Sequence, residues 1–246
     1  MTTTLSPLPF LRSPSSTGHK PNPATTGLVI LNTPIPAGDI LQHIWQHSSF
    51  HICADGGANR LHDFDPSLTP SLIHGDLDSL RPDVRDFYTR KGVDVSLNDD
   101  QYSTDLAKCV GQTLRALPGA TDVVVLGSLG GRVDHGLGLV SELGREALRR
   151  APVRLWLVSE QSISFVLLKG KTGIEVPLAE GLSTQNVGIM PAYGLAHITI
   201  EGFEWDVQDW EMEMGGQVSS SNHLKRDMVT VETDKEVLFT VERRQH

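Results

Sequence analysis

Short apolar runs recur along the first two thirds of the chain, and segments with a helical spacing of apolar residues lie between them. In the segment 104–117, Leu106, Val110, Leu114 and Leu117 fall on one helical face. Further helices are predicted over 40–47, 82–91 and 133–149. The apolar runs are LVILN (28–32), HICA (51–54), SLIHGD (71–76), VDVSL (93–97), DVVVLG (122–127) and VRLWLV (153–158). This alternation predicts a parallel sheet with helices on both faces, and a run as apolar as DVVVLG is typical of a strand buried on both sides.

The pattern changes near residue 160, where strand-like segments follow one another with Gly, Pro, Asn or Asp between them. The segments are SISFVLLKGKTGIEVPL, NVGIMPA, LAHITIEGF, WDVQDWEMEMGG, MVTVETD and EVLFTVER. Short strands in this arrangement predict a small antiparallel sandwich or barrel. The predicted fold class is therefore α/β: a parallel, Rossmann-like α/β domain over residues 27–160, followed by an all-β antiparallel sandwich domain over residues 161–246.

The first 26 residues differ in composition, because they are rich in Ser, Thr and Pro and contain no acidic residue. A mitochondrial targeting segment also lacks acidic residues, but it has to form an amphipathic helix. The prolines oppose such a helix. We therefore expect a disordered tail over residues 1–26.

Charge and cysteine content narrow the classes of partner. The formal net charge of −9 disfavours nucleic acid or an anionic membrane as a partner, and it suits a cationic ligand or a metal ion. No apolar run approaches the roughly 20 residues that span a bilayer. Cys53 and Cys109 both lie in segments predicted to be buried, which indicates free thiols in a reducing compartment and a cytoplasmic protein.

Polar motifs follow four of the predicted strands, each at the point where the strand ends. They are ADGGANRL after the second strand, GDLDS after the third, NDDQYSTD after the fourth and GSLGGRVDH after the fifth. In an open parallel sheet, ligands bind at the carboxyl ends of the strands. We therefore expect these four loops to form one site at a single edge of the sheet.

Three aspartates in these loops are candidates for a metal site. In the sequence Asp76-Leu77-Asp78 the two carboxylates point the same way if the backbone is extended, and Asp105 lies in the first turn of a predicted helix. Two like charges about 4 Å apart at an effective dielectric near 20 cost roughly 4 kcal/mol, and a bound Mg²⁺ offsets this repulsion. The alternative is that GDLDS is a helix-capping turn and that Asp105 complements a helix dipole.

The glycine-rich loop GSLGGRVDHG follows a predicted buried strand and opens a helix, which favours an anion at the helix N-terminus. Gly130 permits close backbone approach, and Arg132 offers two hydrogen bonds to a phosphate. The spacing is neither a dinucleotide fingerprint nor a P-loop. His74 and His135 flank the motifs without a second histidine at metal-ligand spacing, so we assign both a supporting or structural role.

Six motifs in this order resemble the thiamine pyrophosphokinase family. The chain has DGGANR (55–60), GDLDS (75–79), DQYSTDLAK (100–108), GGRVDH (130–135), GFEWD (202–206) and SSSN (219–222). The family patterns are close to D-G-G-A-N-R, G-D-F-D-S, D-Q-D-x-T-D-F-x-K, G-G-R-F-D-H, G-L-K-W-D and S-T-S-N. The resemblance runs from about Leu28 to the C-terminus. It departs at Leu77 and Val133, where the family has Phe, at Tyr102, where it has an acidic residue, and at Glu204, where it has Lys.

The resemblance implies transfer of the terminal diphosphate of ATP to the hydroxyl group of thiamine, with release of AMP. It implies Mg²⁺ on Asp76, Asp78 and Asp105, with Gln101 helping to place the substrates and Asp105 as the candidate proton acceptor. The residues implied to contact ATP are Asp55, Asn59, Arg60, Lys108, Gly130, Arg132 and Asp134, and those implied to contact thiamine are Trp205, Ser219 and Asn222. The resemblance also implies a homodimer, with thiamine bound between the α/β domain of one subunit and the β domain of the other.

Two other functions are compatible with the motifs. One is a metal-dependent phosphatase or glycosyl transferase that uses the Asp76 and Asp78 pair, but it leaves Trp205 without a role. The other is a non-catalytic sensor of thiamine or nucleotide, for which Tyr102 is the only indication. Without the resemblance, Trp205 would be interpreted as a core residue of the sandwich.

Overall fold

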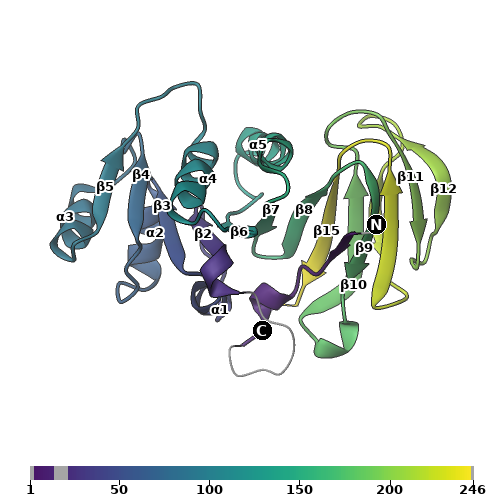
Figure 1. Cartoon of the computed structure of the whole chain (residues 1–246), viewed down its shortest axis with the longest axis horizontal. Coiled ribbons are helices and arrows are strands. Elements are labelled where there is room, and N and C mark those ends of the chain that lie inside the picture. The colour runs from purple at the N-terminus through teal and green to yellow at the C-terminus, as the bar shows by residue number, and fades with distance from the viewer. Residues whose placement is uncertain (1–2, 14–21, 245–246) are drawn as a thin grey trace.

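A mixed sheet of ten strands runs through the whole molecule (Figure 1). The computed structural model describes residues 3–13 and 22–244. The strand order in the sheet is β13-β10-β15-β8-β7-β6-β2-β3-β4-β5, and the last six strands in this order are parallel. These six are β7 (Arg154–Val158), β6 (Asp122–Leu126), β2 (Thr26–Ile30), β3 (Phe50–Ala54), β4 (Leu72–Gly75) and β5 (Asp94–Leu97). The predicted parallel sheet is confirmed.

Helices cover both faces of the parallel part of the sheet. Side chains of β2 alternate between the faces: Leu28 and Ile30 pack in one buried cluster, and Val29 packs in the other, as the two-residue period of a strand requires. The first cluster includes residues of α1 (Ile40–Gln46), α2 (Gly57–Phe64) and α3 (Pro82–Arg90), and the second includes residues of α4 (Asp105–Ala116) and α5 (Val133–Arg150).

The C-terminal part of the chain forms the predicted antiparallel sandwich. One layer is the end of the long sheet, formed by β8 (Ser162–Leu167), β15 (Val237–Arg243), β10 (Ser183–Met190) and β13 (Ser219–His223). The other is a sheet of β1 (Thr3–Leu5), β9 (Gly170–Glu175), β14 (Met228–Thr233), β11 (Ala196–Glu201) and β12 (Val207–Met212). Because β8 pairs antiparallel with β7, the long sheet continues through residue 160, where the sequence pattern changes.

Three local predictions are wrong. ADGGANRL was expected as a loop, but helix α2 begins within it at Gly57. The segment SISFVLLKGKTGIEVPL is two strands, β8 and β9, with a turn between Leu167 and Gly170. The SSSN stretch belongs to strand β13, which was not expected as a strand because its polar residues lack the apolar alternation of a half-buried strand.

The prediction of a disordered tail over residues 1–26 is wrong where the structure describes that segment. Thr3–Leu5 adds a parallel strand beside β9. The ring of Phe10 is buried against Trp156, with 5.6 Å between ring centroids. Arg12 donates two hydrogen bonds to the Glu180 carboxylate, at 2.7 and 2.5 Å. Composition alone missed these contacts, because apolar residues are scattered among the prolines of the segment and pack against distant strands.

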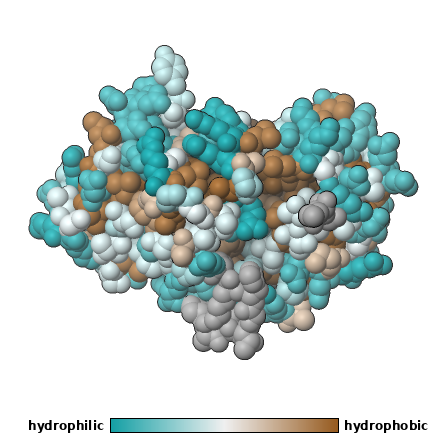
Figure 2. All heavy atoms as spheres, in the orientation of Figure 1, coloured by the Kyte–Doolittle hydropathy of each residue, from teal (hydrophilic) through white to brown (hydrophobic). Residues whose placement is uncertain are grey.

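The surface of the molecule is least polar between its two parts. Figure 2 shows hydrophobic side chains at the surface between the α/β part and the sandwich, in a view where hydrophilic atoms dominate both outer ends. In the described part of the chain, no helix combines the length and the apolar character that crossing a membrane requires.

Candidate active site

The four predicted loops do meet at one edge of the parallel sheet. Strands β6, β2, β3, β4 and β5 are parallel neighbours, so their carboxyl ends lie side by side. Asp55 follows β3, Asp76 follows β4, the loop 98–104 follows β5, and the glycine-rich loop follows β6. Adjacent parallel strands thus bring together motifs that are far apart in the sequence.

Asp55, Asp76 and Asp105 form a carboxylate cluster at this edge. One oxygen of each side chain lies within 4.8 Å of an oxygen of the other two, and this is the only such group of His, Cys, Asp or Glu side chains that the described residues contain. Gly75 makes the convergence possible, because a Cβ at this position would lie 3.1 Å from Asp55 Cβ and 3.3 Å from Asp105 Oδ1. Asp55 itself has a φ of 44°, a left-handed conformation that aspartate tolerates better than most residues.

The cluster has the electrostatics of a cation site. Asp55 Oδ1 and Asp76 Oδ1 are buried without a hydrogen-bond partner. Burial raises the pKa of the Asp55 carboxyl, and the charge of Asp76 adds to the increase. Burial also raises the pKa of Asp105, followed by the charge of Asp76. Buried, unpaired carboxylate oxygens are costly, and a hard divalent cation with oxygen ligands offsets this cost. The residues present therefore fit Mg²⁺.

Asp78 does not join the cluster as the sequence predicted. The expectation that Asp76 and Asp78 point the same way required an extended backbone, but Leu77 has a φ of 64° and turns the chain. The Asp78 side chain is exposed and accepts a hydrogen bond of 3.0 Å from Ser79 Oγ. Its charge still helps to raise the pKa of Asp105. Its role as a metal ligand remains a prediction.

Lys108 lies next to the cluster in the first turns of α4. Its Nζ is 3.7 Å from Asp105 Oδ1 and donates a hydrogen bond of 3.0 Å to the Asn98 carbonyl oxygen. Helix α4 is capped by Thr104, whose hydroxyl oxygen accepts from the Ala107 N–H, as the N-cap geometry requires. A buried ammonium group beside three carboxylates partly compensates their charge and leaves a net negative site.

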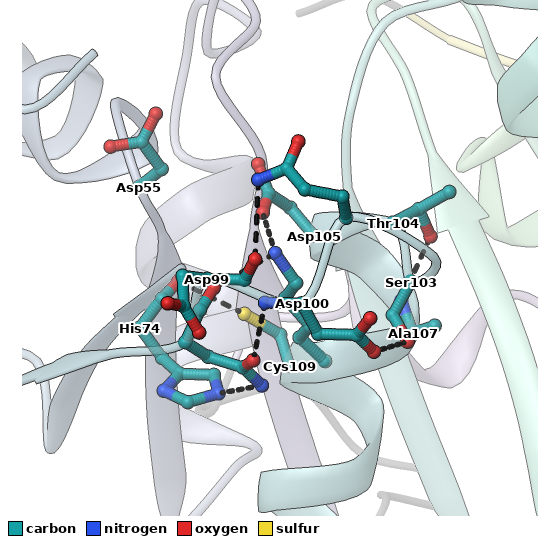
Figure 3. Close-up of polar contacts among 12 residues, drawn as sticks. Asp55, His74, Asp99, Asp100, Ser103, Thr104, Asp105, Ala107 and Cys109 are labelled. Atoms are coloured by element: carbon teal, nitrogen blue, oxygen red, sulfur yellow. Dashed lines mark hydrogen bonds and ion pairs between the residues drawn. The ribbon is translucent and has the colours of Figure 1, made fainter. Parts of the chain in front are cut away.

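Gln101 and Tyr102 have exposed side chains in the loop between β5 and α4. Gln101, predicted to help place the substrates, donates to the Asp99 carbonyl oxygen at 3.2 Å, and its side chain is exposed. Figure 3 shows Asp99, Asp100 and Ser103 of this loop close to Asp105. Tyr102 is 97% exposed. Asp100 holds the loop, accepting from the Tyr102 N–H at 2.9 Å and from Ser103 Oγ at 2.5 Å.

Asn59 and Arg60, two predicted ATP contacts, are engaged within the protein. The Asn59 side chain donates to the Ser79 carbonyl oxygen at 2.7 Å and accepts from the Arg81 N–H at 3.1 Å. It therefore fixes the loop after β4. Arg60 is exposed and donates to Asn32 Oδ1 at 3.0 Å, which directs its guanidinium toward the loop after β2.

Gly130, Arg132 and Asp134 lie in or beside the loop that opens α5, and all three are exposed. The Gly130 N–H donates to Ser128 Oγ at 3.0 Å. Arg132 donates to both oxygens of Asp134, at 3.1 and 2.6 Å, and this contact lowers the pKa of Asp134. A phosphate would therefore compete with Asp134 for the Arg132 guanidinium.

Trp205 is a surface residue, which excludes the alternative of a core tryptophan: it is 55% exposed, in the connection between β11 and β12. We call Glu204, Trp205, Asp206, Asn222 and His223 the tryptophan surface. The Asn222 amide accepts from the Trp205 N–H at 3.2 Å and donates to the Trp205 carbonyl oxygen at 3.0 Å. The predicted thiamine contact Asn222 is therefore buried and holds the tryptophan backbone in place.

The charged groups of the tryptophan surface are all paired. Asp206 accepts from the Gly202 and Phe203 N–H groups, at 3.2 and 2.9 Å. Glu204, which replaces the Lys of the family pattern, lies 2.9 Å from Lys225 Nζ and 2.9 Å from His223 Nδ1. Hydrogen bonds from His223 and Lys225 lower the pKa of Glu204. Lys225 thus compensates the negative charge that Glu204 brings to this surface.

A polar hollow lies next to the tryptophan surface. The His223 ring is 5.3 Å from the Trp205 ring, and His223 also lines a cavity of about 430 Å³ together with Ser220, Ser221 and Thr240. Ser219, the predicted thiamine contact, pairs with Ile189 at the start of strand β13. The structure thus places the SSSN stretch beside Trp205, although the two motifs are separate in the sequence.

Sequence reasoning missed two features of the site. Asp55 was predicted as an ATP contact and not as a member of the carboxylate cluster. A signal was present, because Asp55 directly follows a buried strand that neighbours the strand before Asp76. Asn98 was not singled out, although it organises the loop after β5, because its contacts with His74, Asp100 and Lys108 depend on the folded chain and carry no sequence signature.

Comparisons with known proteins give the family of the chain. Residues 41–155 match the model of "Thiamin pyrophosphokinase, catalytic domain", and residues 171–238 match "Thiamin pyrophosphokinase, vitamin B1 binding domain". Thiamine pyrophosphokinase 1 of Arabidopsis thaliana is 34% identical over 233 residues, which cover 87% of this chain and 85% of the relative. Thiamine pyrophosphokinase 1 of Oryza sativa subsp. japonica is 32% identical over 256 residues, which cover 94% of each chain.

Solved structures share the fold. Yeast thiamin pyrophosphokinase superposes with a TM-score of 0.85 at 24% identity, over 98% of this chain and 91% of that chain. Thiamin pyrophosphokinase from Candida albicans superposes with a TM-score of 0.80 at 21% identity, over 99% and 94%. The two family matches together span both parts of the molecule, and they include the carboxylate cluster and the tryptophan surface. The chain belongs to the thiamine pyrophosphokinase family.

Proposed function

We propose that the chain is an enzyme that transfers the diphosphate group of ATP to the hydroxyl group of thiamine, giving thiamine diphosphate and AMP. In this reaction the thiamine oxygen forms a bond to the β-phosphorus of ATP. The bond between that phosphorus and the oxygen bridging to the α-phosphate breaks, and the hydroxyl proton is released. The observation that carries the proposal is the carboxylate cluster, because its unpaired oxygens lie at the ligand-binding edge of a family-matched domain.

Asp55, Asp76 and Asp105 are the residues that would hold Mg²⁺. Bound there, the ion would neutralise phosphate charge, the main requirement of phosphoryl transfer. Asp78 stays a predicted fourth carboxylate, close enough to influence Asp105. Lys108 supplies a buried positive charge at the same edge, and the exposed Arg132 and the N-terminus of α5 suit phosphate oxygens. These residues bind and orient the nucleotide.

Asp105 is the candidate acceptor of the thiamine hydroxyl proton. Its carboxylate lies at the ligand-binding edge of the sheet, and a carboxylate placed next to the substrate hydroxyl can act as a general base. Gln101 is exposed at the rim and can hydrogen-bond to either substrate. The chemistry therefore rests on positioning and charge neutralisation, with proton removal as a smaller contribution.

Trp205 is the proposed recognition residue for thiamine. Its indole face suits a flat aminopyrimidine and a cationic thiazolium: aromatic stacking adds about 0.5–1.5 kcal/mol, and a desolvated cation–π contact adds about 2 kcal/mol. The hydroxyl groups in the neighbouring hollow, including those of Ser220 and Ser221, and Ser219 can orient the ligand by hydrogen bonds. Asn222 contributes by fixing the Trp205 backbone.

The active unit is proposed to be a homodimer in which Trp205 of one subunit faces the carboxylate cluster of the other. Exposed apolar side chains support this proposal, because Val133 and Leu137 are 74% and 62% exposed one turn apart on α5. Subunit mixing tests it: Asp105→Asn and Trp205→Ala chains, mixed after proven exchange, should recover activity at low thiamine. Exchange without recovery would place each site within one chain.

We also propose a reducing location such as the cytoplasm, since Cys53 and Cys109 are free and buried.

One assay tests the proposed function directly. The protein is incubated with ATP, Mg²⁺ and thiamine, and the nucleotide product is identified by chromatography. AMP that appears only when thiamine is present, in equal amount to thiamine diphosphate, is the expected result. ADP with thiamine monophosphate, or phosphate release without thiamine, would contradict it; the second outcome would favour a phosphatase. Tight binding of thiamine without turnover would favour a sensor.

A further inference from the structure

His74 lies buried beneath the carboxylate cluster and makes contacts in two directions. It is the third residue of β4, with 2% of its surface exposed. Its carbonyl oxygen accepts from the Asp55 N–H at 3.1 Å and from Cys109 Sγ at 3.7 Å. Its ring contacts the Ser96 carbonyl oxygen through Nδ1 and two side-chain amides through Nε2. His74 therefore contacts the Asp55 backbone, helix α4 and the loop after β5, all of which contribute to the site.

The contacts of the ring define its tautomer. Nδ1 lies 3.1 Å from the Ser96 carbonyl oxygen, an acceptor, so Nδ1 carries the hydrogen. Nε2 then accepts, and it lies 3.5 Å from Asn98 Nδ2 and 3.4 Å from Gln112 Nε2. Asn98 belongs to the loop after β5 and Gln112 to α4. The single acceptor atom of His74 thus joins the loop to the helix that carries Asp105 and Lys108.

Asn98 passes this constraint to the site. When its amide nitrogen points to His74, its Oδ1 points the other way and accepts from the Asp100 N–H at 3.1 Å. Asp100 in turn holds Tyr102 and Ser103. The Asn98 carbonyl oxygen accepts from Lys108 Nζ, which lies 3.7 Å from Asp105. Asn98 therefore fixes both the loop that carries Gln101 and the Lys108 ammonium group beside the cluster.

We propose that His74 is a positioning residue for diphosphate transfer, which acts through Asn98 to fix the loop 98–104 and the place of Lys108. It touches neither substrate and holds no metal. This inference rests on the proposed function for its kinetic consequences only, because the contacts themselves are independent of it. The sequence predicted a supporting or structural role for His74, and its contacts with Asn98 and Gln112 specify that role.

The kinetic test replaces His74 by residues with and without an acceptor. His74→Phe removes both ring nitrogens, and kcat should fall by roughly 10- to 100-fold, the effect expected of misplacing catalytic groups by about 1 Å. The KM for thiamine should change less than about twofold, since the ring of His74 contacts Ser96, Asn98 and Gln112 and not the proposed thiamine contact Trp205. His74→Gln restores an amide oxygen that can accept from Asn98, so it should recover part of kcat. Ile73→Val is the matched control: it is a buried neighbour on the same strand without a polar group, and its kcat should equal that of wild type.

A double-mutant comparison tests the route through Asn98. Asn98→Ala alters a half-buried loop residue, so it keeps the fold even if His74→Phe does not. It should lower kcat as His74→Phe does, and the combined variant should lose no more than either single variant, because residues of one network are not additive. Multiplied losses, or a His74→Phe or Asn98→Ala kcat within about twofold of wild type, would overturn the proposal.

Hydrogen exchange supplies a readout that does not depend on activity. The peptide spanning residues 98–104, measured by mass spectrometry without substrates, should exchange faster in His74→Phe and Asn98→Ala than in wild type and Ile73→Val. Unchanged exchange in this peptide would overturn the proposal. If wild type produced no AMP, the proposed function would fail, while the exchange result would still decide whether His74 fixes the loop.

Discussion

The carboxylate cluster and the tryptophan surface differ in whether their carboxylate groups have partners within the protein. In the cluster, Asp55 and Asp76 each leave a buried oxygen unpaired, and burial raises the pKa of Asp55 and Asp105. At the tryptophan surface, Glu204 and Asp206 are both paired with protein donors. We call the cluster electrostatically incomplete, because it has buried carboxylate oxygens without a partner. We call the tryptophan surface complete, because its carboxylates all have partners.

This difference separates two kinds of function within one chain. An incomplete site gains stability when a cation binds. Because a cation bound there would neutralise the charge of the nucleotide phosphates, residues of the cluster are expected to influence the chemical step. At the complete surface both carboxylates already have donors within the protein, and the exposed indole offers area and a π face for an aromatic cation. Substitutions in the cluster should therefore change turnover, and substitutions at Trp205 should change the affinity for one substrate.

The largest effect is expected for Asp105→Asn. This change removes a carboxylate that both holds the cation and accepts the proton, so kcat/KM should fall by roughly 10²- to 10³-fold, as for the loss of one electrostatic stabiliser. Asp78→Asn should lose less, because Asp78 is exposed and outside the cluster. Initial rates of AMP formation at saturating ATP measure both.

A titration with Mg²⁺ is the control for this ranking. Asp105→Asn should need a higher Mg²⁺ concentration for half-maximal rate than Asp78→Asn, and circular dichroism should show both variants folded. Equal losses in the two variants would mean that Asp78 swings into the site when ligands bind, and the cluster would then contain four carboxylates during turnover.

Trp205→Ala should have the second largest effect. Loss of stacking and of a cation–π contact should raise the thiamine KM at least about tenfold and leave the ATP KM nearly unchanged. Trp205→Phe should be intermediate. Because Trp205 is 55% exposed, the melting temperature should stay near that of wild type. An equal weakening of ATP and thiamine would contradict the division between the two regions.

The same contrast explains how far the sequence could predict the site. Strand ends are predictable from apolar runs, so Asp76 and Asp105 were placed at one edge correctly. The positive φ of Leu77 is not predictable from its residue type, and it moved Asp78 out of the expected pair. Asn222 was expected to contact thiamine, but its hydrogen bonds with Trp205 depend on two strands meeting in space.

The fold shows the same limit. The parallel sheet and the sandwich follow from local periodicity, which tertiary packing reinforces. The N-terminal strand Thr3–Leu5 is not locally encoded, since it exists only because β9 offers a free edge. The sequence therefore predicts elements with their own periodicity, and it fails where a segment takes its structure from a distant partner.

A third prediction concerns stability without metal, where the effect is smaller. In EDTA, the raised pKa of Asp105 means that the folded state binds more protons than the unfolded state, so this residue's contribution to stability falls as pH rises. At neutral pH, Asp105→Asn should therefore melt above wild type, by no more than the roughly 2–4 °C that about 1 kcal/mol gives in a chain of this size.

The size of this difference in melting temperature depends on pH. As pH falls through the raised pKa of Asp105, the wild-type carboxyl becomes neutral, and the advantage of Asp105→Asn should shrink and disappear below about pH 4, the pKa of an unfolded aspartate. Added Mg²⁺ should raise the melting temperature of wild type more than that of the variant. A variant that melts below wild type in EDTA at neutral pH would show that Asp105 is already satisfied without a cation, and the cluster would no longer be the incomplete region.

The smallest effect is expected for Glu204→Gln at the tryptophan surface. Glu204 stands where the family pattern has Lys, and its charge would attract the thiazolium if it were free. It is instead paired with Lys225 and His223, and solvent screens such exposed pairs strongly. The thiamine KM should therefore change less than about twofold at physiological ionic strength. Lys225→Ala is the matched comparison: it frees the Glu204 charge and should lower the thiamine KM, mainly at low salt. If Glu204→Gln raised the thiamine KM as much as Trp205→Ala does, charge attraction and not the indole face would dominate thiamine binding, and the tryptophan surface would resemble the carboxylate cluster after all.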